Sequence, residues 1–313
     1  MLGAGVAGLS AARDLARLDH EVVVVEADPE LGGLAASVSL ATTRVERFYH
    51  FICRSDTDLL EMVAELGLGD GLHWSRTRTS FYHDGRLYPF STPADLLRFS
   101  PVPFLQRLRF GLNISRSRYR RSWRDLDRRS AREWLISRIG QRAYDVIWDP
   151  LLRIKFGPYH ERVSAAWIWH RIHRVAASRR WPWEPELLGC LDFGSESLVD
   201  ALRDDLGRRA NVQIRTGRRA ERILVRDGRV AGVRVVGDPD PIPTDAVVST
   251  LALPQLLEIA PDLDPTAQRR LGGVGYLGVV CILLQLHRPL TRSFWINVND
   301  PLVPFNGVIE YTN

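Results

Sequence analysis

The order of apolar and polar residues near the N-terminus predicts a turn, a helix and a strand in succession. After Gly8, apolar residues recur at helical spacing through Leu9, Ala12 and Leu15, which predicts a helix with one buried face. The four consecutive valines at positions 22–25 then predict a short buried strand of the kind found in parallel sheets. We therefore expect an α/β fold.

Farther along the chain, apolar periodicity and turn signals predict a mixture of helices and strands. Alternating apolar residues flank the Asp-Gly pairs at 84–85 and 227–228, which are typical of tight hairpin turns. Capping signals at Ser130 and Ser164 predict the starts of two helices. The longest apolar run, near residues 276–286, predicts a buried strand and is too short to cross a bilayer.

The first turn carries a glycine fingerprint for a dinucleotide. Gly3, Gly5 and Gly8 match G-x-G-x-x-G, in which glycines let the backbone approach a pyrophosphate at a helix N-terminus. Glu26 follows the valine strand, 18 positions after Gly8, where a carboxylate can accept hydrogen bonds from ribose hydroxyls. A glycine-rich helix start without a ligand is the structural alternative, but the ordered turn, helix, strand and acid favour binding.

The segment after Glu26 separates the possible cofactors. Residues 26–35 read EADPELGGLA, and they resemble the E-x(5)-G-G segment of FAD-dependent amine oxidases, protoporphyrinogen oxidases, phytoene desaturases and UDP-galactopyranose mutases. In that superfamily the paired glycines pass close to the pyrophosphate and the flavin, so the resemblance implies FAD. Leu31 and Leu34 stand where many amine oxidases have arginines, which weakens the resemblance to the amine oxidases in particular.

A later part of the chain resembles the returning segment of the same FAD domain. Residues 194–202 resemble its glycine-led helix, and the strands on either side of residues 227–228 resemble its hairpin. Residues 245–250 match the strand that follows. The resemblance places the following residues at FAD: Gly3, Gly5, Val6, Ala7, Gly8, Glu26, Ala27, Gly32, Gly33, Leu34, Ala220 and Thr250.

These segments define the expected domain organisation. We expect a Rossmann-like FAD-binding domain from residues 1–80 and 190–255, and a mixed α+β substrate domain with a helical insert from 81–189 and 256–313. Only two residues precede Gly3, although a Rossmann unit needs a strand there, and the chain stops in what the pattern predicts to be a substrate-domain strand. We therefore expect a truncated chain.

Composition narrows the class of protein. Hydrophobic residues make up 45% and charged residues 25% of the 313 positions, which is ordinary for a soluble globular protein. The N-terminus shows no basic leader before an apolar stretch, so we expect no signal peptide. The three cysteines are widely spaced and odd in number, which predicts a reducing compartment, no disulfide framework and no metal site. A cytoplasmic protein is expected.

Positive charge is concentrated in the predicted helical insert. Ten arginines lie between residues 98 and 129, against two acidic residues, and Tyr119 and Trp123 lie among them. Residues 179–183, RRWPW, repeat this composition. An anionic small-molecule substrate would explain it, and so would peripheral contact with an anionic membrane at its inner face. A solvated helix face in an arginine-rich protein is the plainer reading, and no nucleic-acid module accompanies the charge.

Two residues are candidates for catalysis. His50 lies where the superfamily places a segment against the flavin, so it is either a donor to the flavin or a histidine satisfied within an aromatic cluster. Lys155 is the only lysine among 42 basic residues and has apolar neighbours, which would lower its pKa if it were buried. The alternative for Lys155 is an ordinary residue at a helix end.

The expected function is that of an FAD-dependent oxidoreductase. The resemblance implies hydride removal from a C–H or C–N bond of a small molecule, with the flavin supplying the electron chemistry. One alternative is a non-redox flavoenzyme acting on a sugar nucleotide, similar to UDP-galactopyranose mutase. The other is a degenerate fragment that binds no flavin and has no catalytic activity.

Overall fold

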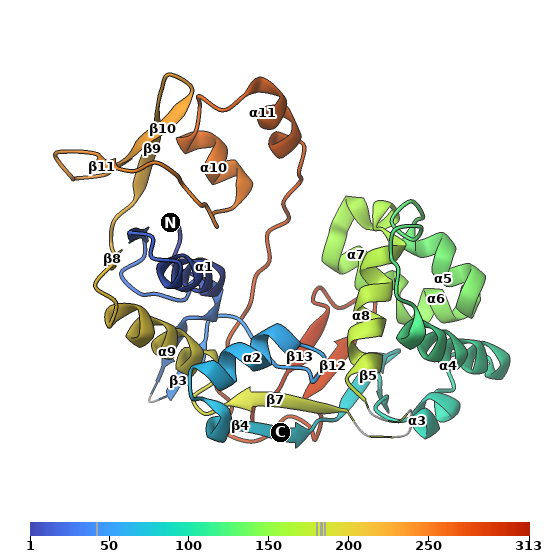
Figure 1. Cartoon of the computed structure of the whole chain (residues 1–313). Helices are drawn as coiled ribbons and strands as arrows, with labels where there is room; N and C mark the ends of the chain where they lie inside the picture. Colours follow the sequence, from blue (N-terminus) through green and yellow to red (C-terminus); the bar gives the residue numbers. More distant parts are fainter. Residues whose placement is uncertain (42, 180, 182–183, 185) are drawn as a thin grey trace. The chain divides into compact units, whose positions relative to one another are not determined.

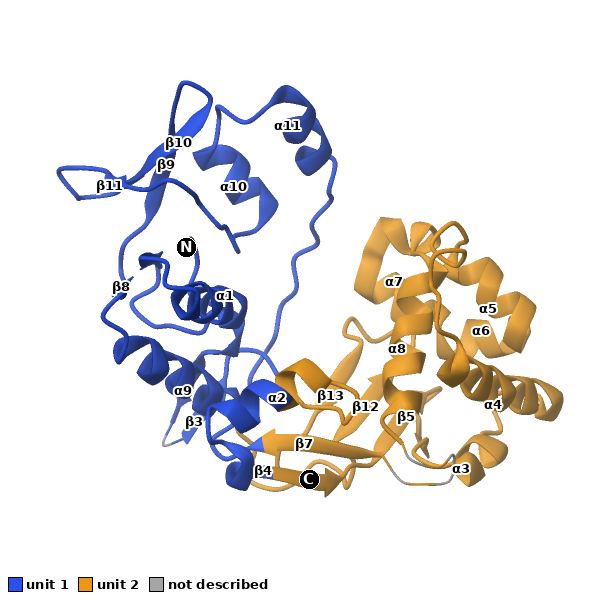
Figure 2. Cartoon of the chain, in the orientation of Figure 1, with its two compact units in different colours: residues 1–50, 61–72, 191–283 blue, residues 51–60, 73–190, 284–313 orange. Residues whose placement is uncertain are grey.

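The computed structural model describes residues 1–41, 43–179, 181, 184 and 186–313 of the chain (Figure 1). The described chain divides into two compact units, which Figure 2 distinguishes by colour. Unit 1 comprises residues 1–50, 61–72 and 191–283, and unit 2 comprises residues 51–60, 73–190 and 284–313. These bounds differ from the predicted domains mainly at 51–60, 73–80 and 256–283. A compact unit is not a functional domain, so the domain assignment stays a prediction.

The parallel strands of unit 1 surround a very short N-terminal segment. Strand β1 (Val22–Val25) pairs in parallel with β8 (Val212–Arg215). Leu2 is 1% exposed and forms parallel bridges to Val25 on one side and Ser249 on the other. The chain entering the glycine loop therefore lies inside the sheet, as in a Rossmann-like fold.

The strand predicted over residues 245–250 is wrong in extent. The structure has only the bridge at Ser249 there, held by hydrogen bonds from Leu2 N–H to Val248 O and from Thr250 N–H to Leu2 O. Leu2 of the neighbouring segment bridges to Ser249, and the chain then turns away at Gly3, whose φ is 92°. A single bridge is not a strand, which needs a ladder of paired residues.

The helix and the hairpin predicted for this part of the chain are both present in unit 1. Helix α1 (Val6–Arg17) packs beside α9 (Ser195–Gly207), and the apolar spacing that predicted a helix after Gly8 is confirmed. The hairpin at 227–228 joins β9 (Ala220–Arg226) and β10 (Arg229–Val235), with Asp227 and Gly228 at positive φ. The other elements are η1 (Gly33–Ala35), β2 (Ser37–Leu40), β3 (Thr43–Glu46), η2 (Gly69–Gly71), β11 (Ile242–Pro243), α10 (Leu253–Ile259) and α11 (Pro265–Gly272).

Unit 2 contains a mixed sheet. Strand β12 (Trp295–Val298) lies between β13 (Gly307–Ile309), to which it is antiparallel, and β5 (Thr79–His83), to which it is parallel. Strand β6 (Arg86–Pro89) pairs antiparallel with β5 through the predicted turn at residues 84–85. Strands β4 (Leu72–Arg76) and β7 (Leu187–Leu191) form a separate pair. Helix α2 (Thr57–Glu65) runs across the division between the units.

The helical part of unit 2 is built around the largest apolar cluster of the described chain. Ser130 and Ser164 cap helix starts as predicted, with their hydroxyls accepting backbone N–H bonds, and Gly140 ends one helix at φ 93°. Buried aromatic and branched side chains fill the space between the helices. The elements are α3 (Pro93–Arg98), α4 (Phe104–Tyr119), α5 (Ala131–Ile139), α6 (Gln141–Ile147), α7 (Asp149–Phe156), η3 (Gly157–Arg162) and α8 (Ala165–Ala177).

The prediction of a buried strand at residues 276–286 is wrong. This stretch is irregular and exposed, with Val279 71%, Val280 86% and Ile282 75% exposed. A strand needs a neighbour to accept its backbone hydrogen bonds, and no described strand lies beside this run. Apolar composition alone therefore predicted an element that has no pairing partner in the described chain.

Other predictions from composition concern cysteines and membranes. Cys53 is buried, and Cys190 and Cys281 are exposed. Among the described residues, none of the helices is both long enough and apolar enough to span a bilayer, and no group of side chains suits a metal ion. Of the basic segment predicted at 179–183, residues 180, 182 and 183 lie outside the described residues.

Candidate functional site

The glycine loop at the start of α1 combines tight packing with one open position. Gly3 has φ 92°, and a Cβ at Gly8 would lie 2.0 Å from Gly3 O, so these two positions exclude other residues. Gly5 differs, because its φ is −69° and a Cβ there would meet nothing nearer than Gly32 O at 3.8 Å. The fold therefore requires glycine at positions 3 and 8 but does not require it at position 5.

The second pair of glycines lies directly against this loop. Gly32 N–H donates to Ala4 O at 2.8 Å, and Gly32 forms a parallel bridge with Gly5. A Cβ at Gly33 would lie 3.3 Å from Gly5 Cα. The close approach of the two backbones therefore depends on the second pair, Gly32 and Gly33, both of which have positive φ. Leu34 follows on this second loop with 69% of its surface exposed.

The start of α1 has the features of an anion site. Gly5 is the N-cap, and no side chain caps the helix, so its first-turn amides are not satisfied by a capping group. Val6 and Ala7, both predicted to contact the cofactor, form this first turn, and Ala7 is exposed. Free amides and the positive end of the helix dipole suit a phosphate group.

Glu26 links the loop to the end of the first strand. Its Oε2 accepts Ala4 N–H at 2.6 Å and its Oε1 accepts Asp28 N–H at 2.9 Å. Each carboxylate oxygen can accept more than one hydrogen bond, so this geometry leaves capacity for ribose hydroxyls. The side chain is half-buried, and the neighbouring Ala27 is exposed.

Two predicted cofactor residues lie farther along the chain but close to this loop. The Thr250 hydroxyl donates to Leu2 O at 3.0 Å, and it would lie 2.7 Å from a Cβ on Gly3. Ala220 starts β9, just after Arg218 N–H donates to Glu26 O at 2.8 Å. The structure thus brings both segments beside the strand end that carries Glu26. Thr250 is seen to hold the loop, and its contact with a cofactor stays a prediction.

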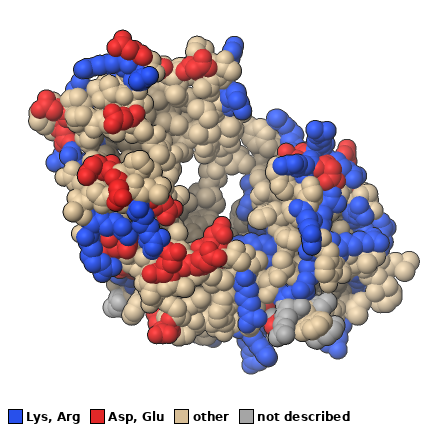
Figure 3. Space-filling model, viewed as in Figure 1, with Lys and Arg blue, Asp and Glu red and all other residues tan. Residues whose placement is uncertain are grey.

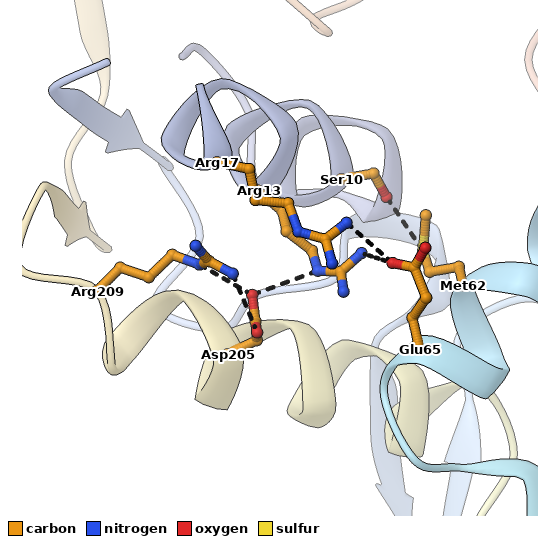
Figure 4. Close-up of polar contacts among 7 residues, drawn as sticks. All are labelled: Ser10, Arg13, Arg17, Met62, Glu65, Asp205 and Arg209. Atoms are coloured by element: carbon orange, nitrogen blue, oxygen red, sulfur yellow. Dashed lines mark hydrogen bonds and ion pairs between the residues drawn. The ribbon is translucent and has the colours of Figure 1, made fainter. Parts of the chain in front are cut away.

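An arginine cluster holds α1 in place from its other side (Figure 4). Arg13 is 4% exposed, and its guanidinium reaches Glu65 Oε2 at 2.8 Å and Asp205 Oδ2 at 3.3 Å. Arg17 also pairs with Glu65, and Arg209 pairs with Asp205. These ion pairs tie α1 to α9 and to the part of α2 that belongs to unit 1. Helix α1, which supplies the glycine loop's amides, is therefore rigidly supported.

Charge beside Glu26 is also fixed by an ion pair. Arg47 Nη1 lies 2.7 Å from Asp28 Oδ2, and this hydrogen bond holds the pKa of Asp28 below its ordinary value. Arg47 also reaches Glu30 Oε2 at 3.3 Å. Arg47 therefore keeps Asp28 ionised at neutral pH and ties it to Glu30 through a shared guanidinium.

Glu46 is a buried carboxylate that the sequence analysis missed. Its Oε1 accepts Ser195 N–H at 2.6 Å, at the first residue of α9, and its Oε2 accepts His50 N–H at 2.9 Å. The side chain is 7% exposed, and a Cβ on Gly194 would lie 2.8 Å from it. A negative charge at a helix N-terminus is stabilised by the helix dipole. The signal in the sequence was the charged residue at an inward position of a strand, together with Gly194 before a helix.

His50, one of the two catalytic candidates, is positioned by Glu46. Its Nδ1 lies 3.7 Å from Glu46 Oε2, and its ring is exposed. Its ring also lies 6.4 Å from that of Phe48, centroid to centroid. The accessible imidazole agrees with the hypothesis of a hydrogen-bond donor, and the neighbouring Phe48 ring agrees with that of a histidine in an aromatic cluster. Its catalytic role stays a prediction.

Lys155, the other candidate, lies in the last turn of α7 in unit 2. Its Nζ is 5.6 Å from the centre of the Trp167 ring, and Arg171 lies over the same ring at 5.3 Å. Lost hydration, followed by the charge of Arg171, lowers the pKa of Lys155. The predicted direction of the pKa shift is therefore confirmed, although the residue as a whole is exposed. Its part in a flavin site stays a prediction.

The residues of the glycine loop fit a dinucleotide such as FAD. The uncapped helix start, the open Cα of Gly5 and the carboxylate of Glu26 supply donors for phosphate, space for close approach and acceptors for ribose. All lie within unit 1, together with Ala220 and Thr250.

Comparison with known proteins gives matches of three kinds. The model of the family described as flavin containing amine oxidoreductase matches residues 6–305. A carotenoid phi-ring synthase from Chlorobaculum tepidum is 27% identical over 266 residues, which are 76% of this chain and 39% of the synthase. The chain thus spans well under half of that relative.

Solved structures share the fold. An oxidoreductase from Methanosarcina mazei has a TM-score of 0.65 at 20% identity, covering 87% of this chain and 63% of that one. Reduced UDP-galactopyranose mutase has a TM-score of 0.68 at 17% identity, covering 100% of this chain and 69% of that one. These identities are low, so the structural likeness shows the fold alone.

Proposed function

The chain belongs to the flavin-containing amine oxidoreductase family, and from this premise we propose that it binds FAD and removes a hydride from a C–H or C–N bond of a small molecule. The chain spans 39% of the curated relative that it matches, so the proposal concerns the protein to which these residues belong. It rests on the family and on the geometry of the glycine loop.

The open position at Gly5 is the observation that carries the proposal. An alanine Cβ would fit there without strain, since φ is −69° and the nearest atom would be 3.8 Å away. Packing and backbone strain therefore do not explain the glycine. A ligand that touches the Cα of residue 5 would explain it, and the uncapped amides of α1 favour an anionic ligand.

The other residues of the loop would hold FAD in complementary ways. The first-turn amides of Val6 and Ala7 would donate to the diphosphate, and Glu26 would accept from ribose hydroxyls. The segment after Gly32 would border the flavin, with Leu34 offering an exposed apolar side chain. When bound, the flavin supplies the acceptor for two electrons and a hydride, and the protein supplies orientation and charge.

We also propose roles for two residues outside the glycine loop, His50 and Lys155. The imidazole of His50 is accessible, and Glu46 fixes its backbone, so it is suited to donate a hydrogen bond to a ligand at the edge of unit 1. Lys155 has a lowered pKa, so it is suited to exchange a proton or to hold a water molecule. We assign no acid–base pair to the reaction.

The carotenoid phi-ring synthase guides which substrates to test first. The synthase is named for a carotenoid ring, which places C–H bonds of unsaturated hydrocarbons ahead of amine C–N bonds as the first substrates to screen. Leu31 and Leu34 agree with this order, because they stand where many amine oxidases have arginines. An anionic small molecule would fit the basic helical part of unit 2.

The visible absorption spectrum of the purified chain tests the cofactor. We expect flavin bands near neutral pH, and FAD in the supernatant after heat denaturation of the protein. A folded protein that is colourless and stays so after incubation with excess FAD would contradict the proposal. Flavin mononucleotide alone in the supernatant would also contradict it, because the loop geometry is assigned to a dinucleotide.

Activity of the flavin-loaded chain separates oxidation from the non-redox alternative. We expect anaerobic addition of a substrate to bleach the flavin bands, which oxygen or a dye then restores. A chain that acts on a sugar nucleotide only after prior reduction, with no net electron transfer, would instead support the mutase-like alternative. Riboflavin-free buffer and heat-killed protein serve as controls.

A further inference from the structure

The outer face of α4 in unit 2 carries apolar side chains where a solvated helix would carry polar ones. Phe104 is 54%, Leu105 72%, Leu108 46%, Leu112 49% and Tyr119 72% exposed. At about 100° of rotation per residue, these five side chains fall within an arc of about 100° along one side of the helix. We call them the α4 apolar stripe. Several large apolar side chains exposed on one side of a helix indicate an interaction surface, whereas single exposed apolar residues are ordinary.

The opposite face of the same helix accounts for the folding of α4. Phe110 is 4% exposed and packs in the core cluster of unit 2, while Asn113 and Ser117 are also buried. The Ser117 carbonyl accepts the Trp169 Nε1–H at 3.2 Å, which fixes α4 to α8. The buried face alone is therefore sufficient to hold α4, and the stripe is not needed for that purpose.

Arginines border the stripe on both sides. Arg109 and Arg116 follow it along one edge and Arg107 and Arg118 along the other, and α4 contains no acidic residue. Two acidic residues in the flanking segments are already engaged. Asp125 is paired with Arg120, and Asp95 belongs to the capping box of α3. Figure 3 shows the wider pattern, in which Lys and Arg gather on the visible face of the helical part of unit 2.

One edge of the stripe opens into a small hollow that is lined by three arginines. Its volume is about 250 Å³, and it is lined by Arg109, Leu112, Asn113, Arg116, Ser137 and Arg138. Arg109 donates to the Ser137 and Arg138 carbonyls, at 2.8 and 3.1 Å. Arg116 and Arg138 have no ion-pair partner among the residues that the structure describes. The Asn113 side-chain nitrogen is buried and has no acceptor there either.

We propose that the outer face of α4 docks the protein on an anionic lipid bilayer, with the α4 apolar stripe between the headgroups and the arginine hollow on a lipid phosphate. An apolar stripe flanked by arginines is the pattern of helices that lie in the plane of a membrane interface. Charge complementarity selects the bilayer, because the donors and cations of the hollow match a phosphodiester. The helix is 16 residues long, about 24 Å, so it suits surface contact.

This proposal does not depend on the proposed flavin chemistry. All its residues belong to unit 2, and the proposed FAD loop belongs to unit 1. Loss of FAD binding and loss of bilayer binding are therefore separate outcomes, each of which has its own assay.

Flotation of the whole chain with vesicles is the direct test. We expect binding to vesicles of equal parts phosphatidylcholine and phosphatidylglycerol, and roughly tenfold weaker binding to phosphatidylcholine alone. Added salt is expected to weaken the anionic binding without abolishing it, because the stripe contributes a part that salt does not screen. Absence of binding to the anionic vesicles at low salt would overturn the proposal.

Two double variants separate the stripe from the hollow. Leu105→Ser with Leu108→Ser should weaken binding by about tenfold or more at all salt concentrations, since each buried methylene contributes to insertion. Arg109→Gln with Arg116→Gln should weaken it by roughly tenfold at low salt and less at high salt. The first pair is exposed, so the variant is expected to fold, and circular dichroism checks this.

Matched controls lie on other parts of the chain. Leu284→Ser with Leu302→Ser removes two leucines that are 73% and 91% exposed, and Arg208→Gln with Arg229→Gln removes two exposed arginines from unit 1. Both controls should bind as the unaltered chain does. If they weaken binding as much as the α4 variants, the adsorption is nonspecific and the proposal is wrong.

Two further results would assign the stripe to another occupant. A concentration-dependent dimer in sedimentation that Leu105→Ser with Leu108→Ser abolishes, without vesicle binding, would show that a second copy covers it. Vesicle binding that this variant leaves unchanged would show adsorption by charge alone. Either result overturns the docking mode proposed for α4.

Discussion

The glycine loop in unit 1 and the outer face of α4 in unit 2 depart from the needs of folding in opposite directions. At Gly5 the residue is smaller than the fold requires, because an alanine Cβ would fit. On α4 the residues are more apolar than an exposed surface requires, because five large side chains face solvent. In both regions a residue that folding does not explain points to a partner outside the chain.

The comparison also holds within each region. Gly8 lies three residues from Gly5 but is demanded by the fold, and Phe110 lies on the same helix as Leu105 but is buried. Each region thus supplies a residue that serves structure and a neighbour that we assign to binding. Substitutions at these paired positions test whether the structural residue contributes to stability and its neighbour does not.

The largest expected effect is that of Gly8→Ala. Its Cβ would lie 2.0 Å from Gly3 O, a backbone atom that cannot move without breaking the sheet around Leu2. We expect a loss of more than about 4 kcal/mol in the free energy of unfolding, measured by urea denaturation, or no folded protein. Gly5→Ala should stay within about 1 kcal/mol of the unaltered chain, the size of a changed helix N-cap. Equal stabilities for the two variants would remove the distinction between these glycines.

A smaller effect is expected from the paired positions on α4. Phe110→Ala should lower the free energy of unfolding by about 3–4 kcal/mol, since it leaves a cavity in the core of unit 2. Leu105→Ala should change it by less than about 0.5 kcal/mol, because that side chain is 72% exposed. A large loss in Leu105→Ala, measured by the same denaturation, would mean that the stripe is part of the fold.

The ion pair between Asp56 and Arg174 in unit 2 gives a pH-dependent effect of intermediate size. Burial alone would raise the pKa of Asp56, but hydrogen bonds from Arg174 and Cys53 N–H outweigh it and lower the pKa. A lowered carboxyl pKa contributes stability above the ordinary value near 3.8, and this is lost as the pH falls through the lower folded value.

Asp56→Asn removes this contribution. Because both side chains are partly exposed, we expect a loss of about 1–2 kcal/mol at pH 7. The difference between the variant and the unaltered chain should shrink as the pH falls below about 4, as followed by urea denaturation at several pH values. A difference that is constant from pH 7 to pH 3 would show that the charge of Asp56 does not stabilise unit 2.

The smallest effect is expected from Gly207→Ala, at the end of α9. A Cβ there would meet nothing within 4 Å, and the residue is helical. Alanine should stabilise the protein by about 0.5–1 kcal/mol, because glycine loses more backbone entropy in a helix. Thermal unfolding measures this small gain, and a loss of stability would show that open space and helical geometry are poor guides at this position.

Local signals allowed much of the fold to be predicted from the sequence. The valines at 22–25, the Asp-Gly turns and the serine caps act within a few residues of themselves, and the structure confirms the elements that they predicted. The irregular conformation of the exposed run at 276–286 could not be predicted, because a strand depends on a pairing partner that lies far away in the sequence. For the same reason, the sequence did not reveal that residues 245–250 form a single bridge at Ser249 instead of a strand.

The candidate site was predictable where it depends on backbone geometry. Gly3, Gly8 and Gly32 are required by close approaches that only glycine allows, so the motif could be read directly. Glu46 could not be read in this way, because its partner Ser195 lies 149 residues away in the sequence. The α4 stripe was hidden too, since the sequence shows a helix with apolar residues but not which of its faces is buried.

The FAD affinities of three forms of the chain show whether Gly5 contacts the cofactor. The cofactor is removed and then titrated into the unaltered chain, Gly5→Ala and Gly207→Ala, with flavin fluorescence as the readout. We predict that Gly5→Ala loses at least about tenfold in affinity while keeping its stability, and that Gly207→Ala binds as the unaltered chain does. Unchanged FAD affinity in a folded Gly5→Ala variant would contradict the assignment of this loop to the cofactor.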